Sequence, residues 1–264
     1  MKKAAPFLIL HEDDNIVAVN KASGIAVCAD RWDDSKERLD KVLAAQINRD
    51  KVFLVHRIDR DTSGLVVFAK NEETHRKLSA AFETRQIKKR YIAAVHGRPS
   101  WKETLCDLPL VPDGNKQHHT IIDKYLGKKS LTHFRLLGSA GNYSIVEAIP
   151  ETGRTHQIRV HLASLGHSIV CDGLYGNSKP VFLSAIKAGW RGDKEEERPL
   201  IDRLGLHAAE LIIPDYFNPA DNHHPKDSVL NINECDLALK APLSRDMAAL
   251  VKQMEKCSAL SFGF

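Results

Sequence analysis

Apolar residues along the chain follow two spacings, and each spacing predicts one kind of element. Short runs that are rich in β-branched residues, or that alternate with polar ones, predict strands. We place these strands at 7–10, 16–20, 52–58, 64–69, 90–96, 130–137, 143–149 and 206–213. Apolar residues three and four positions apart predict helices. We place the helices around 39–47, after Asn71 as the N-cap residue, from a cap at Thr155 to a stop at Gly166, and after Ser244.

The order of these elements predicts the fold class. Strands and helices are mixed without strict alternation, and hairpins recur at 13–15 and 138–142. This favours an α+β fold around a mostly antiparallel sheet over a doubly wound one. The stretch 97–129 is interrupted by Pro and Gly and is interpreted as a loop, and 214–240 as irregular. Neither an internal repeat nor a clean linker is visible, so we expect a single domain over 1–264.

The composition predicts a cellular compartment but does not identify a binding partner. The 264 residues carry 38 Lys and Arg against 34 Asp and Glu, a balance that permits a polyanion partner without arguing for one. The five cysteines lie far apart in sequence, which predicts free thiols in a reducing compartment. No stretch approaches the roughly 20 apolar residues that cross a bilayer. We therefore expect a soluble, cytoplasmic protein with no membrane partner.

The stretch VHRIDRDTSG, residues 55–64, sets polar residues between two apolar runs. One interpretation is a tight turn, since Asp, Thr and Ser side chains bond to turn backbones. Another is a reactive group held rigidly between two strands. A third is a metal bound by Asp59 and Asp61, but two carboxylates rarely complete a metal site without further ligands.

The stretch ETGRTHQIRVHLASLGH, residues 151–167, gathers two arginines and three histidines at a predicted helix. His156 and His161 would diverge by about 140° around that helix, which suits a metal poorly. Neither a His-Glu-x-x-His nor a Cys-x-x-Cys motif occurs, so we expect no metal. Arg154 and Arg159 near a helix N-terminus oppose the helix dipole, which favours a functional reason for them.

The stretch RQIKKRYIAAVHG, residues 85–97, joins a basic run to Tyr91. Such a run with an embedded aromatic suits phosphate contacts and base stacking. A turn from helix to strand with Tyr91 half buried in the core explains it equally well.

Taken together, these stretches resemble the RluA-type family of RNA pseudouridine synthases. HRIDRDTSGLVVFAK resembles the family's aspartate motif, KKRYIAAVHG its tyrosine motif and GRTHQIRVHLASLGHSIVCDGLYG its arginine motif. VNKASGIAV resembles the opening motif and LGLHAAELII the closing strand, with Ala22 and Ser168 where proline is usual. The catalytic core then covers about 7–213, and 214–264 matches the family only loosely. The likeness begins near residue 10, so we expect no accessory RNA-binding module before it.

The resemblance implies a long, mixed, mostly antiparallel sheet with flanking helices, whose two halves flank an RNA cleft. It also implies an isomerase that converts uridine to pseudouridine with no cofactor, because no electrons, water or phosphate are exchanged. Asp59 is then the catalytic acid, Tyr91 the residue that packs on the target base, and Arg159 the partner that favours ionised Asp59. A uridine in a stem has to be flipped out to reach them.

The same resemblance predicts the partner, a structured ribosomal or transfer RNA stem-loop bound by a monomer. We expect Arg57 to fill the space that the flipped base leaves. The expected RNA-binding residues are Lys21, Arg57, Arg60, Thr62, Arg85, Lys88, Lys89, Arg90, Arg154 and His156. Two alternatives remain at this point: an RNA chaperone of the same fold with little catalysis, and an RNA N-glycosidase.

Overall fold

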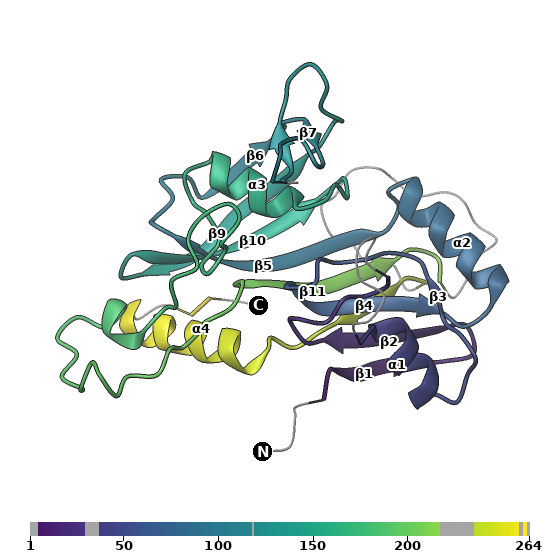
Figure 1. Cartoon of the computed structure of the whole chain (residues 1–264), viewed down its shortest axis with the longest axis horizontal. Helices are drawn as coiled ribbons and strands as arrows, with labels where there is room; N and C mark the ends of the chain where they lie inside the picture. Colours follow the sequence, from purple (N-terminus) through teal and green to yellow (C-terminus); the bar gives the residue numbers. More distant parts are fainter. Residues whose placement is uncertain (1–4, 30–36, 118, 217–234, 259–260, 263–264) are drawn as a thin grey trace. The chain divides into compact units, whose positions relative to one another are not determined.

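The computed structural model describes residues 5–29, 37–117, 119–216, 235–258 and 261–262, which form two compact units (Figure 1). Unit 1 consists of residues 1–90 and 208–242, and unit 2 of residues 91–207 and 243–264. The strand pairings with a defined register are antiparallel in both units. The expected α+β class with a mostly antiparallel sheet is confirmed.

Unit 1 is built on the strand order β1-β2-β4-β11, with β3 paired to β4 and β12 to β11. Its strands are β1 (Phe7–Glu12), β2 (Ile16–Lys21), β3 (Phe53–Leu54), β4 (Ser63–Ala69), β11 (Leu206–Ile213, its first two residues in unit 2) and β12 (Leu237–Lys240). Its helices are α1 (Leu39–Gln46) and α2 (Glu72–Glu83). Every residue of β4 is buried, so this strand is central to the core. The predicted N-cap is confirmed, because Asn71 Oδ1 accepts the Thr74 N–H.

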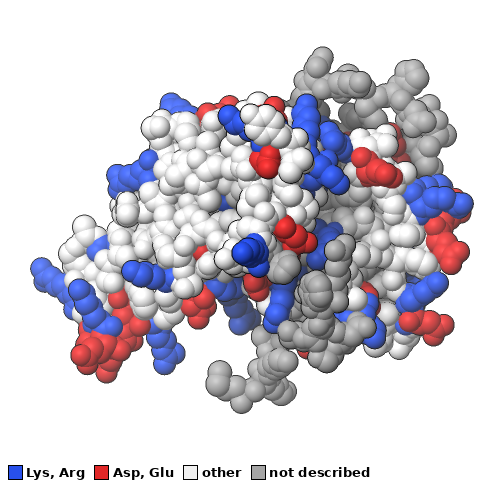
Figure 2. Space-filling view, turned by 45° about the horizontal axis from the view of Figure 1, so that its top comes forward, with Lys and Arg blue, Asp and Glu red and all other residues white. Residues whose placement is uncertain are grey.

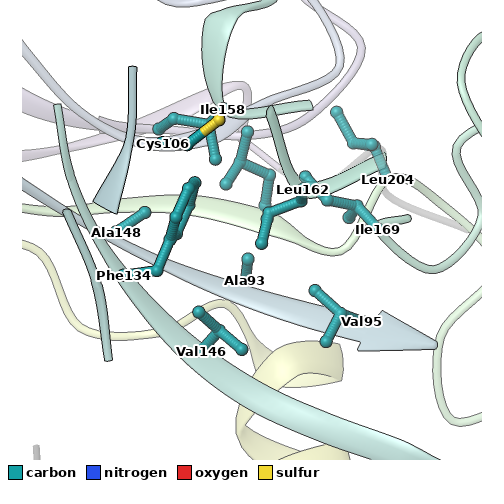
Figure 3. Packing of buried hydrophobic residues seen from close by; sticks show 11 residues of the cluster. Ala93, Val95, Cys106, Phe134, Val146, Ala148, Ile158, Leu162, Ile169 and Leu204 are labelled. Carbon is teal, nitrogen blue, oxygen red and sulfur yellow. The ribbon is translucent and has the colours of Figure 1, made fainter. Parts of the chain in front are cut away.

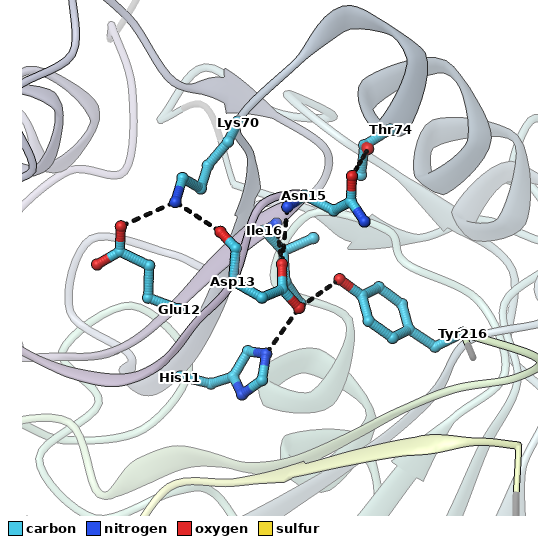
Figure 4. Close-up of polar contacts among 8 residues, drawn as sticks. All are labelled: His11, Glu12, Asp13, Asn15, Ile16, Lys70, Thr74 and Tyr216. Carbon is cyan, nitrogen blue, oxygen red and sulfur yellow. Dashed lines mark hydrogen bonds and ion pairs between the residues drawn. The ribbon is translucent and has the colours of Figure 1, made fainter.

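The turn between β1 and β2 is organised by Asp13 (Figure 4). Its Oδ1 accepts the N–H groups of Asn15 and Ile16, both at 2.8 Å, and its Oδ2 accepts the Tyr216 hydroxyl at 2.7 Å. His11 Nε2 lies 3.0 Å from the same oxygen. Burial would raise the pKa of Asp13, but the bonds from His11, Tyr216 and the backbone outweigh it and lower the pKa to about 2. Asp13 is therefore a structural carboxylate that ties β1 to the chain after β11.

Unit 2 is built on the strand order β5-β10-β9-β6 and a separate pair, β7-β8. Its strands are β5 (Lys88–His96, its first three residues in unit 1), β6 (Glu103–Cys106), β7 (Leu110–Val111), β8 (Ile121–Ile122), β9 (Thr132–Ala140) and β10 (Tyr143–Pro150). Its helices are α3 (Gln157–Ser164), a 3₁₀ turn (Leu183–Ala185) and α4 (Arg245–Ser258).

The core of unit 2 lies between α3 and the sheet (Figure 3). Ile158 and Leu162, four residues apart on one face of α3, pack with Phe134 of β9 and Val146 of β10. Burying this face fixes α3 against the sheet and thereby fixes the polar residues on the rest of the helix.

Several predicted boundaries were wrong. The predicted strand 52–58 is reduced to Phe53–Leu54, and the supposed loop 97–129 contains β6, β7 and β8. The N-cap of α3 is His156 in the left-handed conformation, not Thr155, although the helix does stop before Gly166, which has a φ of +81°. The strand β12 lies within the stretch 214–240 that was interpreted as irregular, while 217–234 is outside the described residues.

The C-terminal part is tied to the core more closely than the sequence indicated. Met247, Leu250, Val251 and Met254 of α4 are buried as predicted. The Phe262 ring packs directly on Gly138 of β9, where any side chain would collide with it. The five cysteines are free thiols, as expected. Among the described residues, no helix is long and apolar enough to span a bilayer.

Candidate active site

The loop that carries Asp59 is held by a buried lysine. Lys21 is fully buried, and its Nζ donates to the carbonyl oxygens of Ala22, Ile25 and Arg60 at 2.9–3.0 Å. The Gly24 N–H also donates to the Arg60 carbonyl at 2.9 Å. These bonds lock the opening motif to the aspartate motif, which lies almost 40 residues later. Lys21 therefore has a structural role here, in place of the predicted phosphate contact.

Asp59 itself is half-buried and begins the tight turn before β4. Its carbonyl accepts the Thr62 N–H at 3.2 Å. Thr62 is buried, and its hydroxyl has no hydrogen-bond partner among the described residues. This position does not suit the RNA contact predicted for Thr62. Arg57 and Arg60 are exposed, and Arg60 Nε donates to the Gly24 carbonyl at 3.0 Å. The turn interpretation of this stretch is thus correct, and it is compatible with the reactive one.

Gly64 ends the turn at a point where only glycine fits. Its φ is +112°, in the region that favours glycine. A Cβ at this position would lie 2.2 Å from the Ala208 carbonyl oxygen of β11. The glycine of the aspartate motif thus allows β4 and β11 to approach each other directly after Asp59.

His56 is a positioning residue that the sequence analysis missed. Its Nε2 accepts the Val67 N–H of β4 at 3.0 Å, and its ring stacks on Phe82 of α2 at 4.5 Å. Burial, and then the charge of Lys89, lower the pKa of His56 to about 3. The ring is therefore neutral and accepts this bond at physiological pH. The only available signal was its place at the start of the aspartate motif.

The predicted basic run lies at the junction of α2 and β5. Arg85 is exposed and has a φ of +63°, the left-handed conformation that usually ends a helix with glycine. Lys88 and Lys89 are half-buried, and burial, followed by Arg85, lowers the pKa of Lys89 to about 8. Arg90 Nε instead forms an ion pair with Glu210 of β11 at 2.7 Å, and both side chains are largely buried. Arg90 thus supports the sheet of unit 1, whereas the sequence analysis predicted that it contacts a phosphate.

Tyr91 is the next residue of β5 and the first residue of unit 2. It is half-buried and packs against the core cluster shown in Figure 3. Its body is therefore fixed by the core, as one interpretation of this stretch expected.

A second residue that the sequence analysis missed, Gln157, fixes the start of α3. Its Oε1 accepts the Thr152 hydroxyl at 2.7 Å and the Arg154 N–H at 3.0 Å. Its Nε2 donates to the Leu131 carbonyl and to the Thr132 hydroxyl. A buried amide with four good partners is a rigid support. Nothing in the sequence pattern distinguishes this glutamine from a surface residue.

Arg159 lies on the first turn of α3 and is buried against Asp172. Its Nε and Nη2 donate to the two carboxylate oxygens at 2.8 and 2.7 Å, a bidentate ion pair. Burial would raise the pKa of Asp172, but the bonds and the charge of Arg159 outweigh it and lower the pKa. Asp172 Oδ1 also accepts the N–H groups of Leu174 and Tyr175. Arg159 is thus held by a fixed carboxylate partner within unit 2, and its catalytic role stays a prediction.

Tyr175 connects this ion pair to the helix cap. The Arg159 guanidinium lies 5.1 Å from the centre of the Tyr175 ring, a cation–π distance. The Tyr175 hydroxyl lies 2.8 Å from His156 Nδ1 and accepts the Thr120 N–H at 2.9 Å. His156 is therefore a component of the support around Arg159. Arg154, the last predicted site residue, is half-buried, and its Nε donates to the Lys129 carbonyl at 3.4 Å.

The three candidate catalytic residues are divided between the two units. Unit 1 holds Asp59 on a turn fixed by Lys21, Gly64 and His56, and unit 2 holds Tyr91 and Arg159. The pairing of Asp59 with Arg159 stays a prediction. Among the residues that the structure describes, no group of three or more His, Cys, Asp or Glu side chains could hold a metal ion.

Comparisons with known proteins identify a family for this chain. Residues 15–164, which include all three candidate catalytic residues, match the family model of RNA pseudouridylate synthases. The dual-specificity RNA pseudouridine synthase RluA of Escherichia coli K12 is 36% identical over 225 residues, which cover 83% of this chain and 93% of that protein. The ribosomal large subunit pseudouridine synthase D of Zymomonas mobilis is 36% identical over 214 residues, and the match covers 78% of this chain and 64% of that relative.

Solved structures support the same fold. Human RNA pseudouridylate synthase domain containing 4 has a TM-score of 0.68 at 23% identity, with 94% of this chain and 92% of that chain covered. Human RNA pseudouridylate synthase domain containing 1 has a TM-score of 0.64 at 24% identity, with both chains fully covered. With a family model that spans more than half of its residues and relatives above 30% identity along most of its length, the chain belongs to the RluA-type RNA pseudouridine synthases, isomerases that convert uridine to pseudouridine in RNA.

Proposed function

We propose that this chain isomerises uridines in a stem-loop of ribosomal or transfer RNA, with Asp59 as the catalytic aspartate. The observation that carries the proposal is the rigid Asp59 turn, which Lys21 and Gly64 build within the region that matches the family. The names of the relatives suggest the class of RNA, since one is a ribosomal large subunit pseudouridine synthase and the other a dual-specificity RNA pseudouridine synthase.

The reaction breaks the bond from the sugar to the uracil nitrogen, turns the base, and joins carbon 5 of the base to the same sugar carbon. The proton on carbon 5 is lost, so the product has the same mass as the substrate once the freed nitrogen has taken up a proton. Asp59 can begin this reaction by attacking the sugar or the base, or by removing a sugar proton. Each route needs the carboxylate in its ionised form, in a pocket from which water is excluded.

The other two catalytic roles are proposed for residues of unit 2. Tyr91 packs on the flipped base, and the packing of its body against the core supports this role. Arg159 favours ionised Asp59, while Asp172 keeps its guanidinium from rotating. Among the predicted RNA contacts, we propose the exposed Arg60 and Arg85 for phosphates, and the exposed Arg57 for the space that the flipped base leaves.

Replacing Asp59 with Asn tests the proposal. We expect Asp59→Asn to keep its RNA affinity and to lose at least about 10⁴-fold in turnover, which corresponds to about 5.5 kcal/mol. The assay is the release of tritium from carbon 5 of uridine in ribosomal and transfer RNA. Asp61→Asn, an exposed aspartate of the same turn, is the matched control and should retain activity within about threefold.

Turnover of Asp59→Asn within tenfold of the wild type would refute the role of Asp59. The mass of the product nucleotide separates the alternatives, because an N-glycosidase would release free uracil. Binding without tritium release by the wild-type protein would instead favour the chaperone.

A further inference from the structure

Unit 2 exposes an aromatic and an aliphatic side chain side by side on a turn after β8. Tyr125 is 97% exposed and Leu126 80% exposed. We call residues 123–127 the Tyr125 turn. Large apolar side chains that are fully exposed next to each other commonly mark an interaction site, and tyrosine is a residue enriched at interfaces.

The Tyr125 turn is rigid, although it lies in solvent. Asp123 Oδ1 accepts the N–H groups of Tyr125 and Leu126 at 2.8 and 2.9 Å. The Gly127 N–H donates to the Asp123 carbonyl, and a Cβ at Gly127 would lie 2.2 Å from that oxygen. These backbone bonds lower the pKa of Asp123. The turn thus fixes the backbone of the two exposed residues before any partner arrives, which reduces the entropy lost on binding.

The chain around the turn is basic. Four exposed lysines lie within residues 110–129, against two aspartates, and the carboxylate of Asp123 is engaged by the turn itself. The lysines are Lys116, Lys124, Lys128 and Lys129. Basic and acidic side chains are both spread over the face of the molecule shown in Figure 2, so net charge alone does not mark the Tyr125 turn as a binding surface. The local combination of lysines with an exposed aromatic is more specific than the overall charge.

The turn is also anchored to the residues that support Arg159. The Thr120 N–H, directly before β8, donates to the hydroxyl of Tyr175, whose ring lies under the Arg159 guanidinium. Arg154 Nε donates to the Lys129 carbonyl after the turn, and the Leu108 carbonyl before β7 is bonded to His161 of α3. Figure 1 shows β7 next to α3. The Tyr125 turn therefore has a fixed position relative to Arg159 within unit 2.

We propose that the Tyr125 turn is a second RNA-binding surface, separate from the reacting nucleotide, on which Tyr125 stacks with an unpaired base of the substrate. Lys124 and Lys128 contact phosphates next to that base. RNA fits better than a protein partner, because the cores of protein interfaces are poor in lysine, whereas lysines beside an exposed aromatic suit single-stranded nucleic acid. The inference rests on the proposed function, and it adds an RNA contact away from the reacting nucleotide.

Fluorescence anisotropy with a labelled RNA hairpin that carries a seven-nucleotide single-stranded loop tests the inference. We expect Tyr125→Ala in the full chain to weaken binding about 5- to 150-fold, the range of one lost base stack, while Tyr125→Trp retains affinity. Lys124→Gln and Lys128→Gln should each reduce the slope of log affinity against log salt by roughly 0.7–0.9. Leu8→Ala, which removes an exposed leucine of β1 in unit 1, is the control and should change neither quantity.

Tyr125→Ala should melt at the temperature of the wild type, since its side chain is almost fully exposed. Unchanged affinity and salt slope in the Tyr125 and lysine variants overturn the inference and leave a protein as the partner of the turn. Tritium release by the wild type, measured in parallel, separates this result from a failure of the proposed function. If the wild type is active and Tyr125→Ala binds normally, the inference alone fails. If the wild type releases no tritium, the proposed function fails, and weaker binding by Tyr125→Ala still supports the RNA contact.

Discussion

Replacing Asp172 with Asn removes one charge from the buried pair that fixes Arg159. The side chains of Arg159 and Asp172 are 5% and 0% exposed, so neither is solvated by water. In the variant, the amide that replaces the carboxylate keeps one oxygen, which can accept Nη2 of Arg159 and the N–H groups of residues 174 and 175. The other carboxylate oxygen becomes an NH₂ group that faces Nε of Arg159, donor against donor.

The loss in the free energy of unfolding follows from leaving a guanidinium buried without its counter-charge. Breaking a buried ion pair by removing one partner costs about 3–5 kcal/mol. Because three of the four hydrogen bonds to residue 172 can persist, we expect about 3 kcal/mol for Asp172→Asn. Asp172→Ala loses all four bonds and should cost about 5 kcal/mol. A loss of about 3 kcal/mol raises the ratio of unfolded to folded protein about 150-fold.

Urea unfolding followed by tryptophan fluorescence measures this loss in unit 2, because the Trp101 ring lies 6.4 Å from the Phe134 ring in the core of that unit. With a slope of about 1–3 kcal/mol/M, a cost of about 3 kcal/mol moves the midpoint down by about 1 M or more. The double variant Arg159→Met with Asp172→Asn is the control, since it removes the buried charge as well. Its cost should fall below the sum of the two single costs by at least about 1 kcal/mol.

A midpoint for Asp172→Asn within about 0.3 M of the wild type would refute the reasoning. It would show that Arg159 has another partner that compensates fully for the lost carboxylate. Additive costs in the double variant would show that the two side chains do not depend on each other.

Three further outcomes test the supports in unit 1. Lys21→Met should destabilise the protein by about 3 kcal/mol, since the three carbonyls that the buried ammonium bonds lose their donor. It should leave the salt dependence of RNA binding unchanged, and a flatter salt dependence would restore the predicted phosphate contact. Gly64→Ala should lower the free energy of unfolding by more than the roughly 1–3 kcal/mol of backbone strain, because its Cβ would collide with β11. Gly24→Ala is the control: its φ is +92° and no atom lies within 4 Å of the added Cβ, so it should lose only the strain energy. Equal melting temperatures for the two variants would contradict the close approach of β4 and β11. Because the pKa of Asp13 is lowered, its contribution to stability is fully present above the unfolded value of 3.8 and is lost as the pH falls toward about 2. The difference in urea midpoint between the wild type and Asp13→Asn should therefore shrink over that pH range. A constant difference would contradict the bonds from His11 and Tyr216.

The fold was largely predictable because its signals are local. The apolar runs on either side of the turn at Asp13, the cap at Asn71 and the buried face of the last helix each depend on residues within a few positions of one another. The strand β6 was missed because its pairing depends on β9, which lies further along the chain. The strands β7 and β8 pair with each other but are only two residues long each, and Pro and Gly around them favoured a loop.

The candidate site was predictable by type of residue but less so by role. Lys21 and Arg90 were expected on RNA, since a basic residue in a motif usually contacts substrate. Their burial depends on carbonyls and on Glu210, which come from other segments. His56 and Gln157 were missed for the same reason, because their roles exist only once β4, α2 and β9 are in place.

The bonds of Lys21 have a consequence for protein engineering. If only the ten residues around Asp59 were grafted onto a new scaffold, the loop would lack a defined conformation, because the ammonium that fixes it comes from a strand almost 40 positions earlier. The smallest segment that can be grafted is therefore discontinuous: it has to include the peptide from β2 through Ile25 as well as the aspartate turn and β4.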